Sequence, residues 1–556
     1  MPQTIFIGVA WPYANGPLHL GHVAGCYLPA DIFARFHRAR GNDVLMVSGS
    51  DEHGTPITVQ AEREGTTPAA VSERYHQLFL QTWPRFGMTW DLYTRTGTEN
   101  HARVTHDIFM RLLEKGYMFR EKMQALKCTN CNRFLPDRYV EGTCPHCGST
   151  GARGDECDKC SRPLNAEELI DPRCGICGGT PALEETEHFF LDLPKFAERL
   201  EKWVGQQQHW KPNVLTFTLN FVKGGLQPRA ITRDLEWGVS VPVAGFEGKR
   251  IYVWFENVIG YLSASKEWAG SRGEPERWRK WWSEPAKSYY FIGKDNIFFH
   301  TLSWPAMLMG YGSLLLPYDV PANEHLTLER RPLSTSRNWA IWLDDFLSRY
   351  DPDALRYALS ANMPESADTD FSWQEFVRRN NDELVATYGN FVHRALSFIA
   401  ARFEGRVPDG SAAIEADHKM RAQAEQAFAR CTEDLEKCRF RAAIGEAMSL
   451  AREGNRYVDA RAPWRGVKSD RADAAASLHT CVQVIAALKT MLYPFLPFSS
   501  QRLHEMLGLK GTIGTGDWKL EPIAAGHALG QPAPLFVRRE ESIVEDELQR
   551  LHSRAT

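Results

Sequence analysis

The chain opens with a strand, a turn and a helix in close succession, and this order constrains the fold more than any other feature. Residues 4–9 (Thr-Ile-Phe-Ile-Gly-Val) form an apolar run of strand length that is rich in β-branched side chains. A turn-rich stretch follows at residues 12–17, and a helical pattern of apolar residues then runs from Leu20 until Gly41 ends it. A strand that feeds a helix through a short turn is typical of α/β folds with a parallel sheet.

Two histidines and a glycine lie in the first turn of that helix. His19, Gly21 and His22 follow the opening strand directly, where backbone N–H groups and the helix dipole favour anions. The imidazoles can donate to phosphate, and a glycine lets a bulky ligand approach the backbone. These residues predict a phosphate site; the alternative is a polar helix N-terminus without a ligand.

The size and charge of the chain set broad limits. At 556 residues it should contain several domains. The formal net charge of −4 gives no global basic signature, but a nucleic acid can still bind through local patches. We find no signal peptide and no apolar segment of the ~18–20 residues that a spanning helix needs. We therefore expect a soluble, cytoplasmic protein without a membrane partner.

A second strand candidate carries polar residues at its end. Val44–Val47 leads into Gly-Ser-Asp-Glu-His-Gly, which places Asp51 and His53 at the C-terminal edge of that strand. Ligands of doubly wound sheets bind at this edge, next to the first strand.

The pattern changes along the rest of the chain. The first ~115 residues alternate strand and helix, and residues from about 122 to 180 are rich in Cys, Gly, Asp and Pro, which predicts an inserted module. Strand-like runs return at residues 231–243, 250–255 and 288–296, so the insertion should split the sheet. From about residue 382 the pattern is helical almost to the end. The fold class is therefore α/β with a parallel sheet, followed by an all-α region.

The inserted module holds four Cys-x-x-Cys pairs. Two such pairs complete a tetrahedral four-thiolate zinc site, so eight cysteines suit two zinc ions. Four disulfides would suit a secreted protein, which this chain does not resemble. The spacing alone permits several pairings, and the closed sites predict a structural role, because the module has few apolar residues. The cysteines are Cys128, Cys131, Cys144, Cys147, Cys157, Cys160, Cys174 and Cys177.

The His-Leu-Gly-His stretch at 19–22 resembles the HIGH signature of class I aminoacyl-tRNA synthetases. The preceding Pro-Tyr-Ala-Asn-Gly at 12–16 resembles the form found in the methionyl-tRNA synthetase family. The resemblance extends from Phe6 to at least Trp464 and implies a Rossmann-type catalytic domain, split by a zinc-knuckle insertion, and an α-helical anticodon domain. The implied domains are 1–115 and 229–325 (catalytic), 116–228 (insertion, Cys-rich at 128–177), 326–378 (connecting fold) and 379–556 (anticodon-binding bundle).

The resemblance implies an amino-acid pocket. Asp51 matches the carboxylate that pairs with the ammonium of the substrate. Aromatic walls suit a thioether, although each aromatic side chain alone could equally belong to the core. Two residues depart from the family pattern, because Trp11 stands where a smaller apolar residue is usual and Asn257 where alanine is usual. The implied pocket residues are Ala10, Trp11, Tyr13, Asp51, Trp254, Asn257, Tyr261 and His300.

The resemblance also implies an ATP site, with Mg²⁺ accompanying the ATP. Its residues are His19, His22, Gly293, Lys294 and Asp295, and Arg233 matches an active-site arginine whose plain alternative is a surface ion pair.

The second class I signature, KMSKS, is altered. Pro332 and Thr335 occupy its lysine positions, Leu333 replaces its methionine, and Ser334 and Ser336 remain. Lysines there stabilise the charge of departing pyrophosphate, which threonine cannot do. Arg330, Arg331 and Arg337 lie near enough to substitute in part.

The helical region carries the implied tRNA contacts. Asn390, Arg394 and Trp464 match positions that read a CAU anticodon in the family, by stacking on unpaired bases and bonding their edges. The family also implies nested zinc sites, in which the two middle knuckles share one ion and the outer two share the other. A monomer is expected, because the bundle is not followed by an OB-like domain of the kind some relatives use to dimerise.

The resemblance therefore implies an ATP-dependent methionine–tRNA ligase. The altered loop, Trp11 and Asn257 keep a first alternative open, a paralogue that transfers an activated amino acid to a small molecule, as enzymes acting with a cupin partner in N–N bond formation do. A second alternative is a non-catalytic tRNA-binding paralogue.

Overall fold

The central sheet is parallel and is assembled from segments far apart in the sequence. The computed structural model describes residues 2–154, 157, 159, 160, 162, 164–335 and 337–554. The strand order is β14-β13-β1-β2-β3, and β1 lies between β2 and β13, with Ile7 opposite Met46 and Tyr289. A strand from beyond residue 280 thus completes the sheet, as predicted. The strands are β1 (Thr4–Val9), β2 (Asp43–Ser50), β3 (Leu92–Arg95), β13 (Lys287–Gly293) and β14 (Ala322–Asn323).

Alternate side chains of the central strands enter two different cores. Ile5, Ile7 and Val9 of β1 pack with α2 in a core that continues into the helical bundle. Phe6 of β1 and Leu45 of β2 pack with α5 and α8 on the other face. Burial on both faces is typical of parallel sheets. The surrounding helices are α1 (Leu20–His22), continued by a π-turn (Val23–Tyr27) into α2 (Leu28–Ala39), then α3 (Thr55–Glu64), α4 (Pro68–Phe86), α5 (Glu99–Glu114), α8 (Val253–Ser271) and α9 (Trp304–Tyr311).

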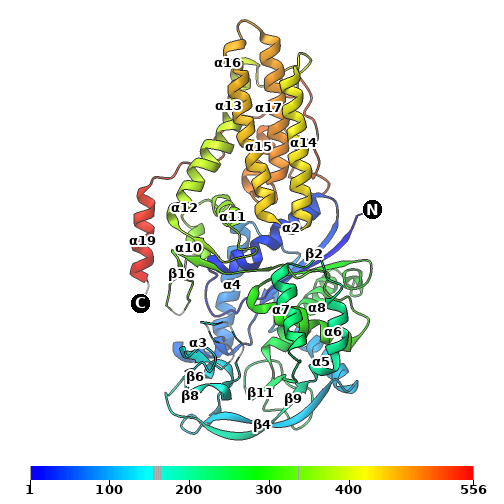
Figure 1. The fold of residues 1–556 in the computed structure, drawn as a ribbon, viewed down its shortest axis with the longest axis vertical. Coiled ribbons are helices and arrows are strands. Elements are labelled where there is room, and N and C mark those ends of the chain that lie inside the picture. Colours follow the sequence, from blue (N-terminus) through cyan, green and yellow to red (C-terminus); the bar gives the residue numbers. More distant parts are fainter. Residues whose placement is uncertain are drawn as a thin grey trace.

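The insertion is a long antiparallel ribbon that carries a small cysteine-rich sheet. β4 (Met118–Cys128) pairs with β9 (Ala182–Leu191) along nearly its whole length. Figure 1 shows this ribbon at the end of the molecule opposite the helical bundle. The other elements are β5 (Arg133–Phe134), β6 (Val140–Thr143), β7 (Thr150–Arg153), β8 (Ile170–Cys174), β10 (Arg229–Ala230), α6 (Ala197–Val204) and α7 (Pro212–Lys223).

Two strand predictions are wrong in extent. Residues 231–243 contribute only β11 (Thr232–Arg233), and residues 250–255 only β12 (Arg250–Ile251), which pair with each other outside the central sheet. From Val253 the chain is helix α8. This helix is buried over most of its surface, so its sequence has the continuous apolar character of a buried strand, and periodicity does not separate the two.

The C-terminal half is mostly helical and includes a small connecting sheet. The prediction of helix almost to the end of the chain is wrong for residues 507–541, which are irregular between α18 and α19. β15 (Leu326–Leu328) lies between β16 (Arg331–Pro332) and β17 (Thr369–Phe371). The last helix, α19, returns to pack against α12, beside the connecting fold (Figure 1). The helices are α10 (Leu343–Leu347), α11 (Pro352–Ala361), α12 (Trp373–Arg378), a π-helical segment (Arg379–Gly389), α13 (Asn390–Arg402), α14 (Glu415–Glu436), α15 (Phe440–Arg461), α16 (Pro463–Gly466), α17 (Arg471–Leu492), α18 (Pro497–Met506) and α19 (Ser542–Arg554).

The expectation that no apolar segment is long enough to span a membrane is wrong for one helix: among the described residues, α17 is long and apolar enough by length and composition. Its most apolar window is 83% buried inside the structure, against α14, α15 and α18. A core helix of a bundle has this burial and this composition.

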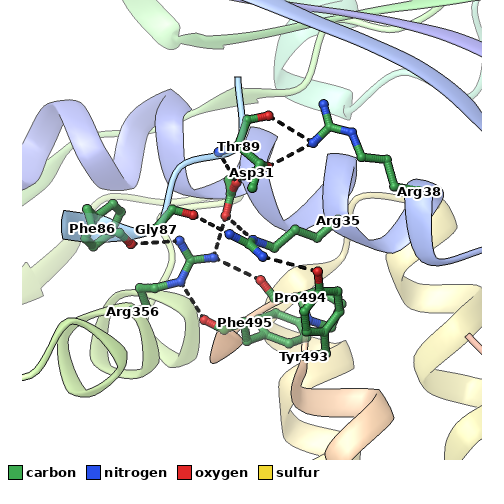
Figure 2. A network of polar contacts seen from close by, with 10 residues as sticks. All are labelled: Asp31, Arg35, Arg38, Phe86, Gly87, Thr89, Arg356, Tyr493, Pro494 and Phe495. Carbon is green, nitrogen blue, oxygen red and sulfur yellow. Dashed lines mark hydrogen bonds and ion pairs between the residues drawn. The ribbon is translucent and has the colours of Figure 1, made fainter. Parts of the chain in front are cut away.

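A buried charge network joins the sheet to the bundle (Figure 2). Asp31 of α2 accepts from Arg35 (Nε–Oδ2, 2.8 Å) and from Arg356 of α11 (Nη2–Oδ2, 2.7 Å). The guanidinium of Arg356 also donates to the backbone oxygens of Phe495 (2.7 Å) and Pro494 (2.9 Å), in the turn between α17 and α18. Asp31 and Arg356 are fully buried, so this junction ties α2, which continues the helical segment that begins at Leu20, to the bundle.

Candidate active site

The carboxyl ends of β1 and β2 bring the predicted site residues to one edge of the sheet. Past the end of β1, the backbone N–H of Ala10 donates to the carbonyl of Phe291 (3.1 Å). Tyr13 and Asp51 then form an isolated parallel bridge that extends the pairing of β1 and β2. Ala10, Tyr13 and Asp51 therefore lie at the edge where a doubly wound sheet binds its ligands.

His19 and His22 stack on each other at the start of α1, with ring centroids 3.7 Å apart. The Nδ1 of His19 accepts from the Gly21 N–H (3.1 Å), and the Nδ1 of His22 accepts from the His19 N–H (3.2 Å). Burial lowers the pKa of His22 to about 4 and holds that of His19 well below its usual range, where the neighbouring His22 also contributes. Both rings are therefore neutral, and each carries its proton on Nε2, because Nδ1 is an acceptor.

This pairing changes the expected chemistry of the helix start. The Gly21 and His19 N–H groups are bonded to imidazoles, and the Leu20 N–H donates to the Ile341 carbonyl (3.2 Å), so these backbone groups do not face an anion. The donors left for a phosphate are the two Nε2–H groups. A Cβ on Gly21 would lie 2.7 Å from Leu333, so the glycine also admits the side chain of the altered loop.

Asp51 is almost fully buried and holds two hydrogen bonds. Its Oδ2 accepts from the Asn257 side chain (2.6 Å) and its Oδ1 from the His53 N–H (3.2 Å). Burial, helped by the charge of Glu256, raises the pKa of Asp51 to about 7. A cationic group beside this carboxyl would reverse that shift, because opposite charges favour ionisation.

One face of α8 supplies much of the predicted pocket. Trp254, Asn257 and Tyr261 are spaced three and four residues apart. Trp254 stacks on Phe299 with ring centroids 4.4 Å apart and meets the edge of Tyr13 at 6.2 Å.

His300 is a neutral acceptor in this pocket. Its Nδ1 lies 2.9 Å from the Asn296 carbonyl and therefore carries the proton, so Nε2 accepts from the Tyr261 hydroxyl at 2.7 Å. Burial lowers the pKa of His300 to about 4.

Trp11 packs into the core beneath this pocket. Its ring lies against Gly49 and Gly260, where an added Cβ would come within 2.3 Å and 2.8 Å of it, respectively. The two glycines explain how the chain accommodates a tryptophan where the family pattern has a smaller residue.

Sequence reasoning missed a buried acid beside Asp51. Glu256 is fully buried and contacts His53 (3.0 Å to Nδ1) and His101 (3.4 Å to Nε2). Burial alone would raise the pKa of Glu256, but the two histidines hold it below its ordinary value. The sequence signal that could have identified Glu256 is a single acidic residue inside the apolar run at the start of α8.

On the nucleotide side, Gly293 ends β13 and faces open space, because a Cβ there would meet nothing within 4 Å. Lys294 pairs with Glu324 (3.0 Å) and Asp368 (2.8 Å), and Asp295 pairs with His325 (2.9 Å). These three acidic and basic partners, Glu324, Asp368 and His325, were not predicted.

Arg233 lies on β11 rather than in the crevice itself. Its guanidinium stacks on the ring of Tyr252 at 3.8 Å and donates to the carbonyls of Ala230 (2.9 Å) and Thr232 (3.0 Å).

The altered loop lies over the helix start. Thr335 reaches Gly16, where an added Cβ would lie 3.6 Å away, and Ser334 pairs with Trp339. Trp342 forms a backbone bridge with His19. Ser336 lies outside the described residues. The three arginines near the altered lysine positions, Arg330, Arg331 and Arg337, are all exposed, and Arg331 also stacks on Trp339 (4.9 Å).

The eight cysteines form two groups, in the nested order that the resemblance implied. Their Sγ atoms lie within 4.8 Å of one another in each group, and none is in a disulfide. Contacts of 3.5 Å (Cys128–Cys177) and 3.6 Å (Cys147–Cys157) approach the ~3.8 Å edge of a tetrahedron with ~2.3 Å metal–sulfur bonds. Both groups can therefore hold a metal ion. They are Cys128, Cys131, Cys174 and Cys177, and Cys144, Cys147, Cys157 and Cys160.

Trp464 lies on α16, which Figure 1 shows at the end of the bundle remote from the sheet. The guanidinium of Arg394 lies 5.0 Å from the Trp464 ring centre and pairs with Asp459 (2.6 Å). Asn390, one turn earlier on α13, donates to Asn455 (3.2 Å). Trp464 is 40% exposed, so its ring face is available for stacking.

Comparisons with known proteins agree with this architecture. Residues 5–396 match the model of tRNA synthetases class I (M), and the parallel sheet with its helix-start histidines and overlying loop is that of a class I tRNA synthetase. Residues 407–555 match the anticodon binding domain of methionyl tRNA ligase. The chain belongs to the methionine–tRNA ligase family of this class and is thus an aminoacyl-tRNA ligase.

Individual relatives cover the whole chain. A methionine–tRNA ligase of Dehalococcoides mccartyi (strain CBDB1) is 57% identical over 551 residues, covering 99% of this chain and 100% of the relative. One from Thermomicrobium roseum is 54% identical over 579 residues, covering 99% of each chain. The crystal structure of Mycobacterium tuberculosis methionyl-tRNA synthetase bound by methionyl-adenylate has the same fold, with a TM-score of 0.81 at 23% identity over 97% of this chain and 100% of that one.

Proposed function

We propose that the chain activates methionine with ATP and then transfers it to the 3′-terminal adenosine of tRNA. In the first step the methionine carboxylate attacks the α-phosphate, forming methionyl-adenylate and releasing pyrophosphate. In the second, a ribose hydroxyl of the tRNA attacks the carbonyl carbon and AMP leaves. The observation that carries this proposal is the convergence of Asp51, the aromatic pocket and the His19–His22 pair at one edge of the sheet.

The two histidines act as neutral donors to the phosphates of ATP. Their Nε2–H groups point away from the helix backbone that binds Nδ1, and their low pKa keeps them neutral at physiological pH. Neutral donors stabilise negative charge without moving a proton onto the leaving group. Mg²⁺ enters with ATP as part of the substrate, and Gly293 and Asp295 receive the adenosine.

Asp51 receives the ammonium of methionine, and the bound substrate adds a positive charge directly beside its buried carboxyl. Trp254, Tyr13 and the Tyr261–His300 pair enclose the thioether, whose sulfur is attracted to aromatic rings. Because His300 is neutral and already accepts from Tyr261, it presents no free charge to an apolar side chain.

The altered loop makes activation slower than an intact signature would. Thr335 can offer the departing pyrophosphate one neutral hydrogen bond in place of an ammonium charge. The loop still reaches the helix start through Leu333. We therefore assign Ser334, Thr335 and Ser336 to the phosphate side and expect a measurable but reduced rate.

Two structural zinc ions fit the cysteine groups. Four thiolates close each tetrahedral site, which leaves no position for a substrate, and the core around them is small. At the bundle end, Trp464 and Arg394 stack on unpaired bases and Asn390 bonds a base edge, reading the CAU anticodon.

We also propose a cytoplasmic monomer. Burial of α17 inside the bundle supports a protein that does not span a membrane. Light scattering of the purified full chain tests the monomeric state directly.

One rival has a specific observation in its favour. The loss of both loop lysines and the polar Asn257 in the pocket would suit a paralogue that transfers an activated amino acid to a small molecule. The anticodon face opposes it, because Arg394 and Trp464 are held in stacking contact although the ring is 40% exposed.

Pyrophosphate exchange across the twenty amino acids tests the proposal. We expect methionine to support exchange far above the others, and Thr335→Lys to increase the rate. Thr512→Lys, which adds the same charge at an exposed threonine elsewhere, is the control and should change nothing. Exchange with another amino acid, or with none, would contradict the proposed activity.

A further inference from the structure

Asn257 is the pocket residue that the family pattern does not explain. It lies on α8 with 4% of its surface exposed, and its Nδ2 donates to Oδ2 of Asp51 at 2.6 Å. The family resemblance implies alanine at this position, which has no side-chain donor. A buried amide bonded to a buried carboxylate makes a short, charge-assisted contact, stronger than a bond between neutral groups.

Asp51 depends on such donors to keep its charge. It is only 2% exposed, and burial and the charge of Glu256 both favour the protonated form. The groups that oppose them are the His53 side chain and N–H, and the Asn257 amide. The charged groups around this carboxyl come from several elements: Glu52 and His53 after β2, Arg95 on β3, His101 on α5 and Glu256 on α8.

The positive charge of His53 is already shared with Glu256. His53 contacts both oxygens of Glu256 at 3.0 Å, and the second histidine on that acid, His101, has its pKa lowered by burial. Arg95 is paired with Glu52 and Glu73 instead of Asp51. Among the described residues, Asn257 is thus the one whose uncharged side chain donates a hydrogen bond directly to Asp51.

We propose that Asn257 is a positioning residue for methionine activation, whose amide favours the ionised form of Asp51 and fixes its orientation to receive the substrate ammonium. The inference rests on the proposed function, in which Asp51 is the ammonium acceptor. The amide donates one proton to Oδ2 and leaves the other lone pairs of the carboxylate for the ammonium. Its contribution is largest near neutral pH, because the pKa of Asp51 is about 7 with the amide in place and would be higher without it.

Asn257→Ala and Asn257→Asp separate this role from simple packing. Alanine removes the donor and restores the residue usual in the family. Aspartate keeps the shape but replaces the donor with a carboxyl that must share a proton with Asp51. Asn100→Ala is the matched control, because the Asn100 amide also bonds α8, donating to the Ser263 carbonyl (2.8 Å), but does not contact Asp51.

The test is methionine-dependent pyrophosphate exchange by the full chain between pH 6 and pH 9. For Asn257→Ala we expect the KM for methionine to rise roughly tenfold or more at pH 7, with the KM for ATP unchanged. The acid limb of kcat/KM should move to higher pH, so that the defect shrinks at pH 9. Asn257→Asp should lose more activity, and Asn100→Ala should match the wild type in KM and pH profile.

Two outcomes would overturn the inference: an unchanged KM for methionine in Asn257→Ala, or a defect that is equal at all pH values, as a packing change would give. Asp51→Asn distinguishes this failure from failure of the proposed function. If Asp51→Asn abolishes exchange while Asn257→Ala is normal, only the inference is wrong. If Asp51→Asn exchanges as well as the wild type, the assignment of Asp51 is wrong.

Discussion

Replacing Asp31 by asparagine should weaken the junction between the sheet and the bundle more than any single surface change. The substitution keeps the shape of the side chain but removes the charge shared by Arg35 and Arg356 (Figure 2). Arg356 is fully buried and the Arg35 side chain is 9% exposed, so both guanidinium groups would lose their common counter-ion out of reach of water. Breaking a buried pair in this way costs about 3–5 kcal/mol.

The pH dependence of this contribution follows from the same contacts. Burial alone would raise the pKa of Asp31, but the two arginines and the Thr89 hydroxyl hold it below its ordinary value. A lowered carboxyl pKa stabilises the fold above the pKa of the unfolded chain, and the contribution is lost as the pH falls through the native value. The penalty of Asp31→Asn should therefore be complete at pH 7 and shrink in acid.

Amide hydrogen exchange in the turn at residues 493–495 and in α11 measures the local stability of this junction. A local measurement is appropriate because a chain of several domains does not unfold in a single step. We expect amide exchange there to be roughly a hundredfold faster or more in Asp31→Asn at pH 7. Glu64→Gln, which breaks the exposed pair with Arg74, is the control and should cost under ~1 kcal/mol. Equal protection in the two variants would refute the reasoning.

Three further perturbations have defined outcomes. Trp464→Ala should lower the rate of tRNA charging by about ten- to a hundredfold, since each lost stack costs ~1–3 kcal/mol. Pyrophosphate exchange should stay unchanged, and an equal loss in both assays would contradict the anticodon role. Metal analysis should give two zinc ions per chain, and Cys144→Ser should lose one of them; loss of both or neither would contradict the nested groups. Asp51→Asn should stabilise the free protein at pH 8, because a carboxyl whose pKa is raised to about 7 destabilises the fold as pH rises. A melting temperature equal to that of the wild type at both pH 8 and pH 5 would contradict this prediction.

The sequence predicted the opening strand, the continuous helix after it and the late strand that completes the sheet. These elements follow from local patterns, because buried parallel strands and an amphipathic helix have distinct periods. The extent of α8 was not predictable in this way. Its buried residues around Tyr261 face the sheet on one side and α5 on the other, so no polar face marks the helical period.

The candidate site was likewise predictable only in part from the sequence. The residue types at His19, Asp51 and His300 were predicted, but their protonation depends on partners that only the fold brings together. The Nδ1 atoms of the histidine pair are occupied by backbone N–H groups, and Glu256 reaches Asp51 and His53 from another element. Arg233 was predicted from its motif alone, whereas its stacking on Tyr252 and its place in the β11–β12 pairing are visible only in the fold.

The most direct test of the central claim is ATP-dependent charging of purified tRNA carrying a CAU anticodon with radiolabelled methionine. The account predicts acid-precipitable methionyl-tRNA, formed more slowly than the Thr335→Lys variant forms it and greatly reduced when the anticodon is changed. Methionine-dependent pyrophosphate exchange without any charging would contradict it and favour a small-molecule acceptor. The absence of both activities would instead favour a tRNA-binding protein without catalysis.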